Sequence, residues 1–382
     1  MATYTSPWMD DELDVFRRSV RQFVRTEFLP NDARWRGQHH VDRDAWSKAG
    51  AMGLLLADVP DTWGGGGGTF AHECVVAEEL WGAGVSSFGH SIQSIVAHYI
   101  LAYGTDAQKR AWLPKMATGE IVAALAMTEP GAGSDVQGLR TTAIREGDSY
   151  VLNGSKTFMT NGYHADLVAV AARTNPTAPG AKGLSMVMVE TRGLAGYRVG
   201  RTLEKLGQHG QDTCELFFDQ VRVPVANLLG PEENRGFAQM MTQLPYERLY
   251  VAVGAVAGLE RAIALATQHA KDRKLFGGRL LDLQHARFTL AECATEARIA
   301  RVFLDDCIIR MIKGALDAVT ASMAKYWITD RHFEIADRCL QVFGGYGYVP
   351  EYEIARNWAD SRVQRIYAGA NEIMKELVAR SL

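Results

Sequence analysis

The sequence predicts an α+β multidomain protein. It comprises an N-terminal α-helical domain over residues 1–120, a central antiparallel β domain over 121–232 and a C-terminal α-helical bundle domain over 233–382. Two observations predict this order. Apolar residues recur at helical spacing in the first and last thirds of the chain and alternate with period two in between. Turn-forming Asn-Gly pairs separate the alternating segments, which indicates a small antiparallel sheet.

The first domain is expected to be all helical. Apolar side chains follow the helical period in two stretches, Leu13, Phe16, Val20, Phe23 and Val24, and then Ala45, Ala49, Met52 and Leu54. A glycine run from Gly64 to Gly68 interrupts the pattern. Glycine amides can cradle a phosphate, but no strand leads into this run and no lysine follows in phosphate-loop register. An ordinary connecting loop is therefore favoured.

The next two domains are predicted from a change of period. The period-two segments predict strands at Ser149–Leu152, Leu167–Ala171, Leu184–Val189 and Glu215–Val221, with turns at Asn153-Gly154 and Asn161-Gly162. From Gly236 onward the helical period returns in segments long enough for a bundle, at Leu249–Lys271, Leu281–Ile312 and Leu316–Phe343.

Composition and charge exclude several classes of protein. Of the 382 residues, 47% are hydrophobic and 22% charged, which suits a soluble protein with sizeable cores and excludes a disordered or fibrous one. The net charge of −3 is spread without long blocks, so no nucleic-acid or polybasic membrane partner is expected. No stretch of 18 residues is apolar without interruption, so no membrane span is expected.

The cysteines and the start of the chain indicate a cytoplasmic location. The five cysteines are widely spaced and form no CxxC pair, which suggests reduced, mostly buried thiols. No secretory leader precedes Trp8, and the residues that follow are too acidic for a transit peptide. His39, His40 and Asp42 could suggest a metal, but adjacent histidines point in different directions and no further ligand pattern follows. No metal site is expected.

Four segments carry candidate chemistry, and the second of them is expected on a strand. Residues 126–135 combine two flexible glycines with backbone and hydroxyl donors that could wrap a planar polar cofactor. Residues 154–162 place Phe158 two positions before Thr160, so that an aromatic ring could stack on a cofactor ring while a hydroxyl bonds its edge. Residues 341–348 follow a predicted helix, where glycines are ordinary C-caps, and residues 366–373 come next. The first segment also suits a plain loop, and each C-terminal segment taken singly is a weak signal.

The order of these segments is specific. Together with Arg-Lys-Leu-Phe-Gly at 273–277 and Gln284, they make the chain resemble the acyl-CoA dehydrogenase family over nearly its whole length. The resemblance implies FAD as cofactor and a subunit whose C-terminal part is a four-helix bundle. It also implies that two subunits share each flavin cleft and that two such dimers form a homotetramer.

The resemblance assigns cofactor contacts to two groups of residues. One subunit would hold the flavin ring through Met127, Thr128, Gly133, Ser134, Phe158, Met159 and Thr160. The neighbouring subunit would grip the pyrophosphate and adenosine side, where an arginine suits paired anionic oxygens, through Arg273, Phe276, Gln284, Gln341, Phe343, Gly344 and Gly345. Three further residues would close around the same cofactor: Ala370, Asn371 and Glu372.

The catalytic base departs from the pattern of many family members. Those members place a glutamate directly after the tyrosine of the last segment, where this chain has Ala368. Because deprotonation needs a carboxylate within reach of the substrate, either the protein is inactive or the base comes from elsewhere. The long-chain and isovaleryl branches use a glutamate before an arginine at the start of a bundle helix, which corresponds to Glu247 before Arg248. The structural alternative for Glu247 is a first-turn helix carboxylate after Pro245.

The same resemblance assigns the substrate contacts. The backbone N–H of Ala368 would hold the thioester oxygen, and the acyl-CoA would touch Ser134, Tyr246, Arg248, Tyr367 and Gly369. We expect two effects to oppose each other at Glu247. The helix N-terminus and Arg248 favour the carboxylate, whereas burial raises the pKa, and burial is expected to prevail.

The implied activity is FAD-dependent α,β-dehydrogenation of an acyl-CoA to a trans-2-enoyl-CoA in fatty-acid or branched-chain catabolism, with electrons passed to an electron-transfer flavoprotein. Two alternatives stay open. An acyl-CoA oxidase of the same fold would pass its electrons to oxygen, although the family's oxidases are usually longer. A catalytically silent binding or assembly protein is disfavoured by the retained flavin motifs and by Glu247.

Overall fold

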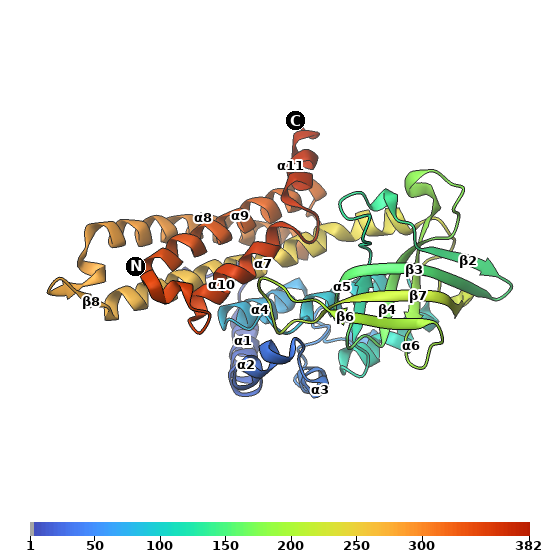
Figure 1. Cartoon of the computed structure of the whole chain (residues 1–382), viewed down its shortest axis with the longest axis horizontal. Coiled ribbons are helices and arrows are strands. Elements are labelled where there is room, and N and C mark those ends of the chain that lie inside the picture. Colours follow the sequence, from blue (N-terminus) through green and yellow to red (C-terminus); the bar gives the residue numbers. More distant parts are fainter. Residues whose placement is uncertain (1–3) are drawn as a thin grey trace.

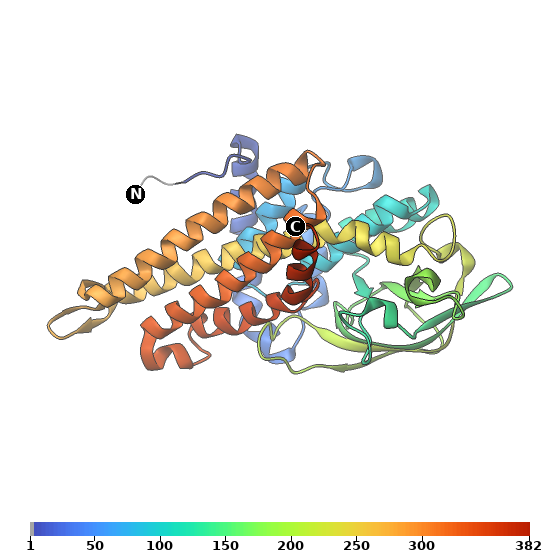
Figure 2. The same cartoon turned by 90° about the horizontal axis from the view of Figure 1, so that it is seen from above.

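The computed structural model describes residues 4–382 and shows an elongated molecule (Figure 1). A β-sheet lies at one end and a small hairpin, β8 (Lys274–Leu275) and β9 (Gly278–Arg279), at the other. The long helix α7 (Gly236–Asp272) runs between them, and the N-terminal helices pack against its middle (Figures 1 and 2). The predicted order of helical, β and helical regions is confirmed.

The first region is helical as predicted. Its helices are α1 (Asp11–Phe23), α2 (Leu29–Gln38), α3 (Arg43–Ala51), α4 (Phe70–Gly82), α5 (His90–Tyr103) and α6 (Asp106–Ala117). The glycine run between α3 and α4 is a structural loop, because the N–H groups of Gly66, Gly67 and Gly68 donate to carbonyls within residues 56–59. These amides are therefore not free to cradle an anion.

The central region holds one seven-stranded sheet. Its strands are β1 (Ala123–Ala126), β2 (Thr142–Glu146), β3 (Ser149–Thr160), β4 (Leu167–Arg173), β5 (Leu184–Glu190), β6 (Tyr197–Thr202) and β7 (Thr213–Pro224). The order is β1-β4-β2-β3-β7-β6, with β5 also paired to β4. The expectation of an antiparallel sheet is wrong in one respect: β4 pairs in parallel with β1 and, at one residue pair, with β2.

One predicted turn is also wrong. Asn153-Gly154 lies inside β3, where a register shift against β7 forms a bulge instead of a hairpin turn. Asn153 Oδ1 accepts a hydrogen bond from the Gln220 N–H at 2.9 Å across this bulge. Gly154 has φ +148 and sits too close to Thr141 for a Cβ. The second pair, Asn161-Gly162, does form a turn directly after β3.

The C-terminal region is a bundle of α7, α8, α9 and a shorter fourth helix, followed by α11. The remaining bounds are α8 (Gln284–Ile312), α9 (Ala318–Phe343), α10 (Glu353–Arg362) and α11 (Asn371–Ala379). The predicted start of the first bundle helix at Leu249 is wrong, since α7 begins at Gly236 and continues through Pro245. Gly236 packs on the backbone of Ser185 in β5, where a Cβ would clash, so the helix starts against the sheet.

Two hydrophobic cores hold these regions together. The first helical region and the bundle share one continuous cluster, which runs from Val20 and Trp35 to Leu259 and Ile335. The sheet has a second cluster between its own strands, including Leu152, Val170 and Leu216. The helical regions are therefore one packed body with α7 at its centre, and the boundaries at 120 and 232 stay predictions.

The helix α7 is long and apolar enough to pass for a membrane span by length and composition. Two-thirds of its apolar window, 67%, is buried inside the protein, and the helix carries Glu247 and Arg248 in its buried part. A mostly buried helix of this kind is typical of a protein core.

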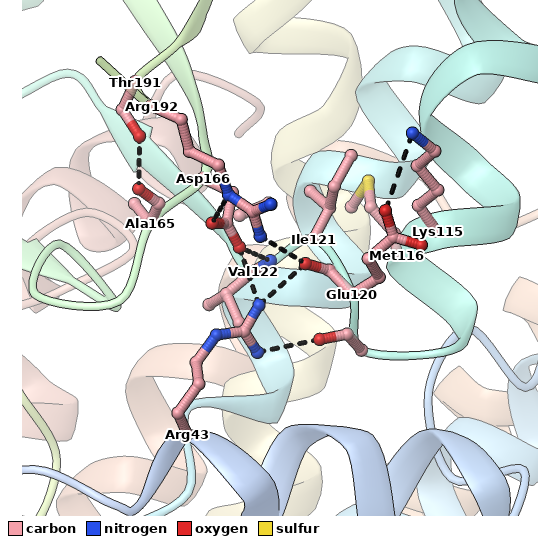
Figure 3. A network of polar contacts seen from close by, with 12 residues as sticks. Arg43, Lys115, Met116, Glu120, Ile121, Val122, Ala165, Asp166, Thr191 and Arg192 are labelled. Atoms are coloured by element: carbon pink, nitrogen blue, oxygen red, sulfur yellow. Dashed lines mark hydrogen bonds and ion pairs between the residues drawn. The ribbon is translucent and has the colours of Figure 1, made fainter. Parts of the chain in front are cut away.

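A polar network joins the first helical region to the sheet (Figure 3). Arg43 at the start of α3 donates to the carbonyls of Gly119 and Glu120 at 2.8 and 2.7 Å and to Asp166 at 2.8 Å. Asp166 also accepts the buried N–H of Val122 at 2.9 Å. Because β1 begins directly after Val122, this carboxylate fixes where the chain enters the sheet.

We predict that Asp166→Ala lowers the free energy of unfolding by about 2 kcal/mol, because it leaves the buried N–H of Val122 without a partner and removes the carboxylate that pairs with Arg43. The matched control is Arg192→Ala, which removes a 68% exposed partner of the same carboxylate and should cost less than about 1 kcal/mol. Urea unfolding curves measure both changes. Equal losses in the two variants would contradict a role for Asp166 in joining the domains.

Candidate active site

The segment that follows β1 is held by a buried lysine of β3. Lys156 Nζ donates to the carbonyl of Met127 at 2.9 Å, to the carbonyl of Ala171 at 2.8 Å and to Glu129 Oε1 at 2.9 Å. Burial lowers the pKa of Lys156 to about 8, although Glu129 opposes this shift. The lysine therefore ties together the two residues on either side of Thr128.

This bond network brings the first two predicted flavin segments side by side. The N–H of Thr157 donates to the Thr128 carbonyl at 3.0 Å. Gly133 and Ser134 are exposed, and Phe158 is 65% exposed with φ +62, an unusual state for a large apolar residue. Thr128 and Thr160 are half-buried.

Met159 lies differently from the other predicted contacts of this group. Its side chain is buried in the core cluster of the sheet. Only its backbone remains available to a cofactor.

The second predicted group lies at the other end of the molecule. Arg273 directly follows α7, and its guanidinium lies 5.8 Å from the ring centre of Tyr346. Within residues 4–382 the Arg273 side chain makes no ion pair. Phe276 at the tip of the β8–β9 hairpin is 91% exposed with φ +50. Also exposed around the end of α9 are Gln284, Gln341, Gly344 and Gly345.

Phe343 does not share this exposure. Its ring stacks on His269 with 4.1 Å between the ring centres and an interplanar angle of 19°. The side chain therefore packs inside the bundle instead of facing a ligand.

The two groups are far apart within one chain. Along α7, the rise of 1.5 Å per residue puts Arg273 about 39 Å from Glu247. Figure 1 shows the sheet and the β8–β9 hairpin at opposite ends of the molecule. The two predicted groups therefore lie on separate parts of the chain.

Glu247 is buried in the interior of α7. Its Oε1 accepts a hydrogen bond from the hydroxyl of Tyr99 in α5 at 3.0 Å. Burial raises the pKa of Glu247 to about 7, while the Tyr99 hydrogen bond and the charge of Arg248 oppose this shift. The direction agrees with the expectation that burial prevails.

One expected influence on this carboxyl group is wrong. Glu247 was expected in the first turn of a helix, but α7 starts at Gly236, so Glu247 lies about three turns from the helix N-terminus. The effect of a helix dipole falls off within the first turn. The proline at 245 therefore marks no helix start, and the helix end does not favour the carboxylate.

The two neighbours of Glu247 on α7 are also buried. The Tyr246 hydroxyl donates to Asp58 at 3.2 Å, and its ring lies 4.1 Å from that of His98. Arg248 Nη1 donates to Ser322 Oγ at 3.1 Å, while its buried Nε has no partner among the described residues. Substrate contacts for both side chains stay predictions.

A tight turn lies between η8 (Val363–Arg365) and α11. Ala368 has φ +52 and Gly369 has φ +90, a left-handed conformation that an alanine adopts only under strain. Lys325 of α9 donates to the Gly369 carbonyl at 2.6 Å and to Asn371 Oδ1 at 2.9 Å. Burial lowers the pKa of Lys325 to about 7.

This turn leaves backbone donors free. The N–H of Ala368 makes no hydrogen bond within the described part of the chain. The Asn371 side chain, in contrast, is fully used by bonds to α9, so it can offer a cofactor only its backbone. Around them, Tyr367, Gly369 and Ala370 are half-buried and Glu372 is exposed.

Three polar residues of the site were not predicted from the sequence. Lys156 lies inside the candidate segment 154–162, and Lys325 lies in a largely apolar stretch of the predicted helix Leu316–Phe343, where a lysine was the available sign of a buried role. Tyr99 had no such sign, because an apolar helix position suits a tyrosine in any core. The residues that were considered and rejected as metal ligands have other contacts: Asp42 accepts from Trp35 Nε1 at 2.9 Å, and His40 stacks on Tyr163. Among residues 4–382, no group of three or more His, Cys, Asp or Glu side chains could hold a metal ion.

Comparison with known families covers nearly the whole chain. The models described as acyl-CoA dehydrogenase N-terminal, middle and C-terminal domains match residues 10–120, 124–221 and 234–382. The chain belongs to the acyl-CoA dehydrogenase family. It is 44% identical to the mitochondrial long-chain specific acyl-CoA dehydrogenase of Sus scrofa, over 97% of this chain and 86% of that protein.

Solved structures of acyl-CoA dehydrogenases agree with this assignment. The enzyme from Geobacillus kaustophilus superposes with a TM-score of 0.96 at 44% identity and covers 99% of both chains. A glutaryl-CoA dehydrogenase from Mycobacterium smegmatis, solved in complex with FADH2, has a TM-score of 0.87 at 25% identity, over 98% of this chain and 95% of that one. This acyl-CoA dehydrogenase is an FAD flavoprotein oxidoreductase.

The exposed residues fit FAD. An arginine without a carboxylate partner suits a pyrophosphate, and an exposed aromatic beside a threonine suits a flavin ring. Residues that would hold the cofactor include Thr128, Ser134, Phe158, Arg273 and Gln341.

We predict a pH-dependent stability change for Glu247→Gln. The pKa of Glu247 is about 7 in the folded protein and about 4.3 in an unfolded chain, so ionisation costs the folded state free energy as pH rises through that window. The amide cannot ionise. The variant should therefore gain up to about 3 kcal/mol over the parent above pH 7, and the gain should vanish towards pH 4.

Thermal melts at pH 4.5 and pH 8 check this prediction. The difference in melting temperature between the variant and the parent should be larger at pH 8. A difference that is the same at both values would contradict a pKa raised by burial.

Proposed function

We propose that Glu247 is the general base of an acyl-CoA dehydrogenase that converts an acyl-CoA to a trans-2-enoyl-CoA. One observation supports this most directly: Glu247 is buried and its pKa is near 7, at a site where Ala368 offers no carboxylate. A base with a pKa near the working pH removes a proton most effectively. FAD, when bound, supplies the hydride acceptor.

The substrate's thioester carbonyl would accept a hydrogen bond from the free N–H of Ala368. Developing negative charge on that oxygen needs a fixed donor, and the strained turn held by Lys325 supplies one without reorganisation. Ser134, Tyr367 and Gly369 would line the rest of the substrate path. Long acyl chains are our proposed substrate class, because the 44% identical mammalian relative carries that specificity in its name.

The proposed assembly is a homotetramer of two dimers. It is supported by the placement of the ring-side group at the sheet end of the molecule and of Arg273 at the far end of α7 (Figure 1), since each flavin would need the ring-side group of one chain and Arg273 of another. Electrons would leave to an electron-transfer flavoprotein instead of oxygen. All five cysteines are unpaired and buried, in keeping with the proposed cytoplasmic location.

We predict that Glu247→Gln binds FAD like the parent but that acyl-CoA reduces its flavin several orders of magnitude more slowly. The amide keeps the shape and loses the proton acceptor, so the barrier should rise by roughly 4 kcal/mol or more. Anaerobic stopped-flow absorbance with a series of acyl-CoA chain lengths measures this rate.

The matched control is Glu260→Gln, the same change on the same helix at a carboxylate paired with Arg301. Its flavin should be reduced at the parent rate. Flavin reduction in Glu247→Gln at near the parent rate would refute the base assignment. In the parent, stoichiometric peroxide at full turnover in air would refute the proposed acceptor and favour the oxidase.

A further inference from the structure

The base makes one hydrogen bond, and its geometry distinguishes the two carboxylate oxygens. Tyr99 donates to Glu247 Oε1 at 3.0 Å. Oε2 makes no hydrogen bond within residues 4–382, and it is absent from the fully buried polar atoms that lack a partner. Oε2 therefore keeps some access to open space, while Oε1 is turned towards α5.

We propose that Tyr99 is the positioning residue of the base: its hydroxyl holds Glu247 Oε1 so that Oε2 alone faces the substrate. This inference rests on Glu247 being the base. A buried tyrosine in a helix packed on α7 is a rigid donor, because its ring cannot turn away without opening the core. A carboxylate with one oxygen fixed presents the other along one direction, as abstraction of an α-proton requires.

The surroundings leave few other groups to set the state of this carboxyl group. Tyr99 faces it from α5, with the ring of Tyr103 6.4 Å behind, and Arg248 follows it on α7. Lys325 of α9 faces Arg248. Asp58 and Glu73 carry the carboxylates on the α4 side. They face Tyr246 and Tyr250 of α7 instead of Glu247.

Tyr99 remains a donor over the working pH range. Burial is the largest of the causes that raise the pKa of Tyr99 well above its ordinary value. The second is the charge of Glu247. A donor that stays protonated favours the ionised carboxyl group. Tyr99 therefore counteracts burial and keeps a usable fraction of the base ionised near neutrality.

The test is the pH profile of flavin reduction in Tyr99→Phe holoenzyme. Removal of the donor should move the apparent pKa of the base upward by about one unit, which means a roughly tenfold slower reduction at pH 6.5 and a much smaller loss at pH 9. A role in packing alone would lower the rate equally at all pH values. The midpoint of the pH-dependent change in melting temperature should move in the same direction, which gives a readout independent of turnover.

The matched control is Tyr103→Phe. Tyr103 lies one turn further along α5, and its hydroxyl donates to the Gln239 carbonyl at 3.4 Å, away from Glu247. Its profile should coincide with that of the parent. A Tyr99→Phe profile that coincides with the parent, is scaled uniformly, or moves no more than that of Tyr103→Phe would overturn the inference.

A second variant covers the case in which Tyr99→Phe does not fold. With 3-fluorotyrosine at position 99, the hydroxyl is a stronger donor of nearly the same size, so the profile should move to lower pH. An unchanged profile or a shift to higher pH would overturn the inference. Failure here is distinct from failure of the proposed function, because only Glu247→Gln tests whether Glu247 is the base.

Discussion

The length of α7 is the constraint on which the rest of the structure depends. One continuous helix of 37 residues starts against the sheet, carries Glu247 in its buried part and ends at Arg273 beside the β8–β9 hairpin. At 1.5 Å per residue it is about 55 Å long. The core shared by the first helical region and the bundle packs around it. In our proposal the catalytic unit is therefore a pair of chains, because each chain carries two halves of two different cofactor sites.

Burial shifts the pKa of each charged group at the site. The number of hydrogen-bond partners then decides whether that group holds a loop in place or stays free to react. Lys156 and Lys325 are fully buried, and each makes two or more hydrogen bonds that fix a loop, around Thr128 and at Gly369 respectively. Glu247 is also buried but has a single side-chain donor. Burial pulls all three pKa values towards neutrality. The lysines become structural, whereas the carboxyl group keeps one oxygen free to react.

The sequence predicted features that depend on local pattern or on spacing within a motif. The helical, β and helical regions follow from periodicity, and Phe158 was identified from its place before Thr160. What the sequence did not predict depends on contacts between distant segments. Tyr99 meets Glu247 across 148 positions of the chain, and β1 pairs in parallel with β4, with Asp166 bonded to the Val122 N–H just before β1. The proline at 245 suggested a helix start, but packing of Gly236 on β5 begins the helix earlier.

Complementation between two inactive variants tests the shared site most directly. Glu247→Gln and Arg273→Ala would be co-expressed with different tags, and dimers that carry both tags would be isolated and assayed beside each variant alone. If each flavin uses Glu247 of one chain and Arg273 of the other, every mixed dimer has one intact site and one site with both defects. The isolated mixed dimers should then recover about half of the parent activity, from variants that are each nearly inactive. Mixed dimers no more active than the single variants would contradict a site built from two chains.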